Sequence, residues 1–158
     1  MSYLENVPDY LMLYKVDAVN NGGKYTWNIP SSYYSNQRGQ VCYVSLCDCL
    51  VDDTGVDEEI AVKYHSGGQN YHSTKNSGAY LGGLSTSVES AGHSHHKYDA
   101  DRVKLLVSAR PTTIELSTVN CNDDLVELDE VIFVLKFEYL NTENTNNQYI
   151  NTFSKTQI

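Results

Sequence analysis

The stretch "VIFVLKFEYL", Val131 to Leu140, is the most strand-like part of the sequence and decides the fold class. Successive side chains of a β-strand point to opposite faces, so alternate residues share a face. One face would carry only apolar or aromatic side chains, those of Val131, Phe133, Leu135, Phe137 and Tyr139. The other face turns polar at Lys136 and Glu138. A strand that is buried on one face and wet on the other is typical of an antiparallel sheet.

The rest of the chain repeats this type of pattern in short runs separated by turn residues. No window of ten or more residues shows apolar positions at helical spacing with believable caps. We therefore predict an all-β, eight-stranded antiparallel sandwich, formed by a single domain over residues 10–140. The other seven expected strands are residues 10–16, 24–29, 39–50, 59–65, 78–88, 102–108 and 112–119. "NNGG" at 20–23 predicts a tight turn, and residues 66–77 and 89–101 read as long polar loops.

The chain ends differ from this domain in composition. Residues 1–9 form a short leading segment, and residues 141–158, "NTENTNNQYINTFSKTQI", are rich in Asn and Thr with little charge. Such a segment can hydrogen-bond along another surface or add a strand to an exposed sheet edge. We expect residues 1–9 and 141–158 to be extended arms outside the core, although disorder is an equal alternative for the second.

Net charge and hydropathy exclude several classes of partner. The formal net charge of the 158-residue chain is −9, and an acidic surface repels phosphate backbones, so no direct nucleic-acid binding is expected. No apolar run approaches the roughly 20 residues of a membrane span. The first ten residues lack the charged start and apolar core of a signal peptide, which predicts a protein kept in a reducing cytoplasm.

The four cysteines do not form a metal or redox motif. Cys47 and Cys49 are expected on one face of a strand, which is poor geometry for a disulfide, and the spacing is wrong for a zinc site. They read as reduced thiols that act as small apolar side chains. No Gly-x-Ser-x-Gly elbow or phosphate-binding loop is present. We expect no catalysis, no catalytic residue and no cofactor.

"GHSHHKYD", residues 92–99, is the sharpest candidate for metal chemistry. On a strand His93 and His95 would share a face, and Asp99 follows them. A His-x-His pair with a later carboxylate resembles the first metal motif of cupins, which would need a further His ligand. No histidine follows His96, so only His65 or His72 could be that ligand. A solvated loop is the simpler interpretation of this segment, so a metal site is not our preferred prediction.

Tyrosine is unusually abundant, with 13 residues against three Phe and one Trp. Exposed aromatic rings could form a sugar-stacking platform, because sandwiches of this kind occur in lectin domains. The candidates for such a platform are Tyr25, Trp27, Tyr33, Tyr34, Tyr71 and Tyr80. The same rings could equally anchor a protein interface.

Three segments resemble one protein family. "ARPTTIELSTVN" (109–120), then "LDEVIFVLKFEYL" (128–140), and the earlier "KYTWNIPSSYY" (24–34) resemble segments of the jelly-roll capsid proteins of polinton-like viruses, virophages and related viruses. The resemblance implies an eight-stranded jelly roll, and a single copy fits this chain length. It implies a minor capsid protein of an icosahedral dsDNA virus, first of all the pentameric penton at the vertices. The tight turn at 20–23 fits this fold less well, since a jelly roll places its first two strands in opposite sheets.

The resemblance also implies partners and a location. The chain would form a homopentamer, or a trimer if it is a spike or receptor-binding module, and would contact the neighbouring major capsid protein. It would be part of the virion, assembled in the host cytoplasm or a viral factory. We expect the self-interface to include the arms and one loop, with candidate contacts at Tyr33, Tyr34, Asn141, Tyr149 and Phe153.

Overall fold

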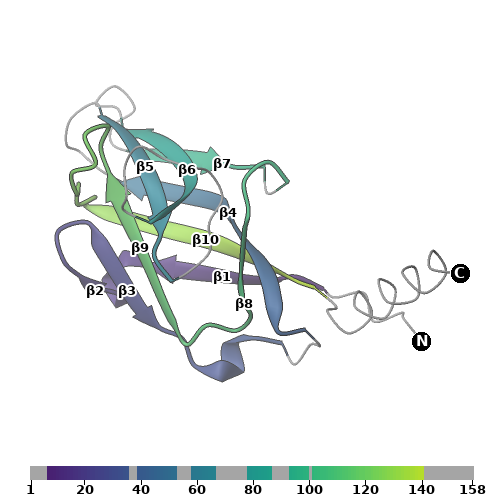
Figure 1. Cartoon of the computed structure of the whole chain (residues 1–158). Coiled ribbons are helices and arrows are strands. Elements are labelled where there is room, and N and C mark those ends of the chain that lie inside the picture. The colour runs from purple at the N-terminus through teal and green to yellow at the C-terminus, as the bar shows by residue number, and fades with distance from the viewer. Residues whose placement is uncertain are drawn as a thin grey trace, which may run out of the picture.

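A computed structural model of the chain describes residues 7–35, 39–52, 58–66, 78–86, 93–99 and 101–140 (Figure 1). These residues form strands and two 3₁₀ turns, η1 (Lys15–Asp17) and η2 (Ser31–Tyr33), and none of them forms a helix long and apolar enough to cross a membrane. The strands are β1 (Asp9–Tyr14), β2 (Val19–Asn20), β3 (Lys24–Asn28), β4 (Val41–Asp52), β5 (Glu58–Tyr64), β6 (Ala79–Thr86), β7 (His93–Lys97), β8 (Leu105–Ser108), β9 (Thr113–Val119) and β10 (Glu130–Tyr139).

The strands lie in two sheets whose pairs are all antiparallel, which confirms the predicted all-β antiparallel class. Sheet A has the order β1-β10-β4-β7, and β8 pairs with the first part of β4. Sheet B has the order β2-β3-β9-β5-β6. Early strands pair with late ones in reverse order: β1 with β10, β3 with β9, β4 with β7 and β8, and β5 with β6. The chain thus folds as one long antiparallel hairpin whose paired strands are divided between two sheets.

The described residues form ten strands where the sequence predicted eight, and the two additions have local causes. β2 forms because the turn at residues 20–23 folds Val19 and Asn20 back onto β3. The predicted turn therefore exists, and the passage from sheet A to sheet B takes place before it, at η1. β7 lies inside the segment 89–101 that we expected to be a loop, so that prediction is wrong for His93–Lys97. β4 is long enough to pair with β8 at Val41–Val44 and with β7 at Asp48–Asp52.

The core lies between the sheets and is built on β10. All five residues of the predicted apolar face of Val131–Leu140 are buried, which confirms the alternation inferred from the sequence. The Phe133 ring packs against two aromatic rings of β3, with its centroid 5.8 Å from that of Tyr25 and 6.0 Å from that of Trp27. Farther along β10, the Phe137 ring meets Tyr34 edge-on at 5.8 Å. Burial of these side chains supplies the main favourable term of folding.

A β-bulge in β4 changes the expected placement of two cysteines. Leu46 pairs with Leu135 and Asp48 with Val134, so Cys47 is an extra residue in β4. The bulge lets Leu46 and Cys49 both point into the core, because it shifts the alternation by one residue. Cys49 is therefore buried, whereas Cys47 is only partly covered, and the expectation that they share a face is wrong.

Hydrogen bonds join the start of β1 to two distant segments, the loop at Ser35 and the end of β10. Asp9, which we assigned to the leading arm, is the first residue of β1. Its carboxylate accepts hydrogen bonds from the backbone N–H and hydroxyl of Ser35, each at 2.9 Å, and from the hydroxyl of Tyr139 at 2.5 Å. Residues 1–6 and 141–158, the remainder of the predicted arms, lie outside the described residues.

The turn between β2 and β3 supports a first prediction, with a matched control in the next residue. Gly23 has a φ of +112°, and an added Cβ would lie 2.8 Å from the backbone oxygen of Val126. We expect Gly23→Ala to lower the unfolding free energy by about 3 kcal/mol, from strain and overlap together. Gly22 (φ +68°) has open space around it, so Gly22→Ala should cost only about 1 kcal/mol. Urea unfolding checks this, and equal losses would contradict the predicted close approach to Val126.

Candidate binding surface

β1 is apolar on both of its faces, although only one of them faces the core. Leu11 and Leu13 point inward and are buried. The residues between them point outward, and Tyr10 and Met12 are 56% and 57% exposed. Tyr14 and Val16 continue the exposed apolar series beyond them. A strand that is apolar at nearly every position is typical of one covered on both sides, so the outer face of β1 has the composition of a buried surface.

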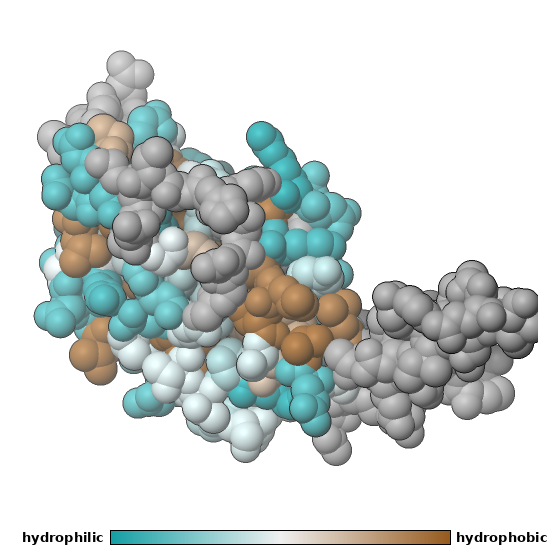
Figure 2. Space-filling model, viewed as in Figure 1, coloured by the Kyte–Doolittle hydropathy of each residue, from teal (hydrophilic) through white to brown (hydrophobic). Residues whose placement is uncertain are grey.

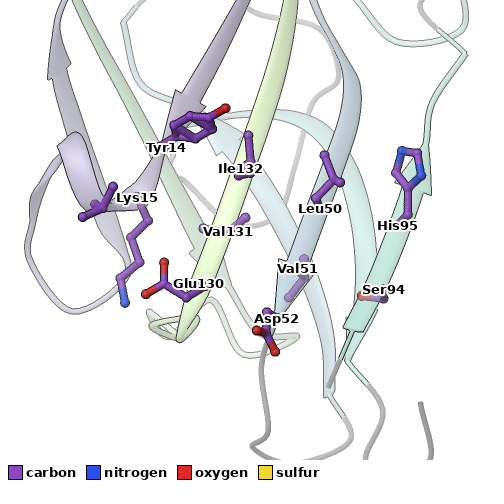
Figure 3. A pocket seen from close by; sticks show the side chains of 11 residues that line it. Tyr14, Lys15, Leu50, Val51, Asp52, Ser94, His95, Glu130, Val131 and Ile132 are labelled. Carbon is purple, nitrogen blue, oxygen red and sulfur yellow. The ribbon is translucent and has the colours of Figure 1, made fainter. Parts of the chain in front are cut away.

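This apolar strip extends across sheet A as a cross-strand row. Tyr14 pairs with Ile132, Ile132 with Leu50, and Leu50 with His95. Figure 3 shows these four side chains side by side on β1, β10, β4 and β7, on the same face of the sheet. Neighbours on one face of adjacent strands contact each other directly. The row therefore makes a continuous surface, apolar at three of its four positions, at the end of sheet A where β10 begins.

A groove of about 590 Å³ lies along this row (Figure 3). It is lined by Tyr14, Lys15, Val16, Leu50, Val51, Asp52, Ser94, His95, Glu130, Val131 and Ile132. We call the outward side chains of Tyr10, Met12, Tyr14, Val16, Leu50 and Ile132, together with this groove, the sheet A face. Exposed apolar patches bordered by polar residues mark interaction sites.

Polar groups at the rim of the groove are already oriented by the fold. The ammonium group of Lys15 donates to the backbone oxygens of Leu128 (2.6 Å) and Asp129 (2.8 Å), and lies 3.4 Å from a carboxylate oxygen of Glu127. At the opposite side, Nε2 of His95 lies 2.9 Å from a carboxylate oxygen of Asp48. These contacts fix the rim and leave the apolar floor open to a partner.

Where the structure describes their side chains, the residues that the sequence offered as metal ligands contact other groups of the chain. His95 contacts Asp48, and the carboxylate of Asp99 accepts a hydrogen bond from the backbone N–H of Asp101 in the turn after β7. His93 begins β7, but its side chain is outside the described part, as is all of His72. His65 contacts the hydroxyl of Ser117 at 2.6 Å. Among the described residues, no three His, Cys, Asp or Glu side chains gather to form a metal site.

The buried thiols are poorly suited to nucleophilic chemistry. All four cysteines are free thiols. Burial raises the pKa of Cys42 to about 11 and that of Cys49 to about 12. Burial also raises the pKa of Cys47. The thiolate is the reactive form, so these side chains act as apolar residues at neutral pH.

The aromatic residues considered for sugar binding are mainly core residues. Tyr25 and Trp27 are buried between the sheets, because β3 turns its alternate residues inward. Tyr34 is only 7% exposed, and its hydroxyl donates to the backbone oxygen of Pro111 at 2.6 Å. Tyr34 is therefore a core residue, not the surface contact that we expected, whereas Tyr33 is 63% exposed. Tyr71 and the other expected contacts, Asn141, Tyr149 and Phe153, lie outside the described residues.

Figure 2 shows the molecule from the side viewed in Figure 1, where hydrophobic side chains gather in the region of β8. Leu106 of β8 is half exposed, and it pairs with Tyr43 of β4. The ammonium group of Lys104 lies 4.5 Å from the centre of the Tyr43 ring, which partly covers it. The sheet A face combines several exposed apolar side chains with a groove, so it is the stronger candidate for a partner.

The comparisons with known proteins give no family assignment: no family model, no curated protein and no solved structure matches this chain.

The sheet A face was not predicted from the sequence, although one signal was available. "YLMLYKV" at 10–16 is apolar at every position except Lys15, a pattern of burial on both faces. An exposed apolar patch with a polar rim is typical of a surface that contacts another protein.

Proposed function

We propose that the protein is a single jelly-roll capsid protein without catalytic activity, which assembles as a homopentamer at the vertices of an icosahedral dsDNA virus. In this proposal its partners are further copies of itself and the neighbouring major capsid protein, and its location is the virion. The viral assignment follows from the family resemblance of residues 24–34 and 109–140. The observation that carries the assembly role is the apolar sheet A face.

The strand order supports the jelly-roll assignment. If β2 is counted with β3, and β7 and β8 are the two halves of one edge strand, eight strand positions remain. The first strand then lies beside the last, the second beside the seventh, the third beside the sixth and the fourth beside the fifth. A jelly roll has eight antiparallel strands in two sheets, and this architecture is widespread in viral capsids.

The sheet A face supports assembly over a solitary role. Large apolar side chains on the surface of β1 are unfavourable in water and favourable at a subunit contact. Closed rings form when two different patches on each copy meet head to tail. The sheet A face would supply one such patch, and the exposed area around Leu106, at the other edge of sheet A, is available to supply the second.

The mass of the purified full chain in solution tests this function. Light scattering over a concentration series, with and without a metal chelator, is expected to give a five-chain particle that the chelator leaves unchanged. A trimer would replace the penton assignment with a spike or receptor-binding module. A monomer that loses stability with chelator would overturn the structural role and favour the cupin-like alternative at residues 92–99.

A pair of matched variants links assembly to the sheet A face. Met12→Glu places a charge on the β1 part of this face and removes apolar contact area worth about 1–2 kcal/mol. We expect it to weaken assembly at least about tenfold, measured as the midpoint of the dilution curve. Leu125→Glu is the control, because Leu125 is also exposed (48%) but follows β9 of sheet B. Equal weakening by both variants would remove the sheet A face from the interface.

A further inference from the structure

The sheet A face has an open strand edge as well as an apolar surface. Within the described residues β1 pairs with β10 on one side only, and it lies at the rim of sheet A (Figure 1). In an antiparallel pair, alternate backbone N–H and C=O groups point to the neighbour, and the others point away. An edge strand with large apolar side chains is a template for the addition of another strand. The edge of β1 thus offers backbone hydrogen bonds next to Tyr10 and Met12, whereas the backbone oxygen of Tyr14 accepts one from the indole N–H of Trp27 at 2.9 Å.

We infer that residues 148–155 of the same chain add to this edge as a further strand, parallel to β1. The connectivity places the segment there. β10 ends at Tyr139, and Phe137 pairs with Asp9, so the chain leaves sheet A beside the start of β1. A segment that turns back at this point runs in the same direction as β1.

The length of the intervening chain fits this path. Neighbouring strands lie about 4.8 Å apart, so the segment must pass over β1 and move by two strand spacings, about 10 Å. Residues 141–147 cover up to about 23 Å when extended. They bring the chain to Gln148 at the start of β1, with enough residues left to follow the six residues of β1.

The side-chain pattern of the segment matches the face that it would extend. With Tyr149 beside Tyr10, the period of two places Phe153 beside Tyr14 and Lys155 beside Val16. The two aromatic rings would then enlarge the apolar surface of β1. Lys155 would reach the start of β10, where Glu130 lies at the rim of the groove. Residues 141–158 contain one Glu and one Lys, so they carry no net charge against a chain of net charge −9.

Hydrogen exchange of the full chain, followed at single residues by mass spectrometry, tests this inference. Residues 148–155 and the amides of β1 that point away from β10 should both exchange slowly. The double variant Tyr149→Ser with Phe153→Ser should speed exchange at both places at least about tenfold. The amides of β1 that point to β10 should stay protected, which shows that the variant is folded. Thr142→Ser with Thr145→Ser is the matched control and should change neither.

Three outcomes would overturn the inference. Fast exchange of residues 148–155 in the unaltered chain would mean that no strand forms there. Protection of the β1 edge that is insensitive to the double variant would assign the edge to another occupant. If dilution dissociates an oligomer and the protection is lost at the same time, the segment pairs with a neighbouring copy. The inference does not depend on the capsid proposal, because a monomer with the slow, variant-sensitive exchange would still support it.

Discussion

Replacement of Phe133 by alanine is expected to lower the free energy of unfolding by about 3–5 kcal/mol. Phe133 is fully buried at the centre of β10, where its ring touches both Tyr25 and Trp27 of the opposite sheet. Small-to-medium domains are stable by only about 5–15 kcal/mol in total, so this single change would remove a large part of that margin. Urea unfolding followed by circular dichroism measures the effect.

Two further variants on the same strand and site make this prediction specific. Phe133→Leu keeps most of the buried volume and should cost clearly less than Phe133→Ala. Val134→Ala lies on the outer face of β10, where the side chain is only partly buried, and should cost about 1 kcal/mol or less. A loss below about 1 kcal/mol for Phe133→Ala would mean that the ring does not bridge the two sheets.

The sequence was sufficient to predict the elements whose apolar pattern is strong. Val131–Leu140 showed its buried and wet faces directly, because each face alternates without interruption. All eight expected strands are present with shifted ends. β7 could not be predicted in the same way, since His93–Lys97 has no apolar alternation and pairs only because β4 extends beyond β8.

The errors at single side chains have a different origin. Nothing in "SLCDCL" marks Cys47 as the extra residue of a bulge, because that depends on the register with β10. Tyr33 and Tyr34 are chemically identical, and only the 3₁₀ turn η2 decides that Tyr34 enters the core. The contact of His95 was hidden for a similar reason, because the pairing of β7 with β4 brings His95 to Asp48. Such outcomes depend on contacts between distant segments, which a local pattern does not contain.

A second large effect is expected from alkaline pH, because several buried groups are neutral in the folded state and titrate late. Burial raises the pKa of Cys42 to about 11, that of Cys49 to about 12 and that of Tyr64 to about 12. Burial also raises the pKa of Tyr34, Tyr98 and Tyr139. In the unfolded chain these thiols and phenols titrate near 9 and 10.

The sign of the effect follows from proton linkage. A group whose folded pKa is raised keeps its proton in the folded state at a pH where the unfolded chain has lost it. The stabilisation is complete below the unfolded pKa and is lost as the pH rises toward the folded value. Between its unfolded and its folded pKa, each such group lowers the free energy of unfolding by about 1.4 kcal/mol per pH unit. With three or more groups in the window between pH 10 and 11, we expect a loss on the order of 4 kcal/mol and unfolding by about pH 11.

Urea unfolding at a series of pH values, with reducing agent present, measures the slope, and two cysteine variants assign it. Cys49→Ala removes one late-titrating group, so stability should fall less steeply above pH 9 even though the variant is weaker at neutral pH. Cys121→Ala is the control for the loss of a thiol, since Cys121 is exposed and outside the core. The last phase of the rise in tyrosinate absorbance should coincide with the loss of the circular dichroism signal, because the buried phenols ionise only when the sheets separate. Absorbance that reaches its final value well before unfolding would place Tyr64 and the other buried phenols in contact with water, and the two-sheet core would then be looser than the contacts of β10 imply.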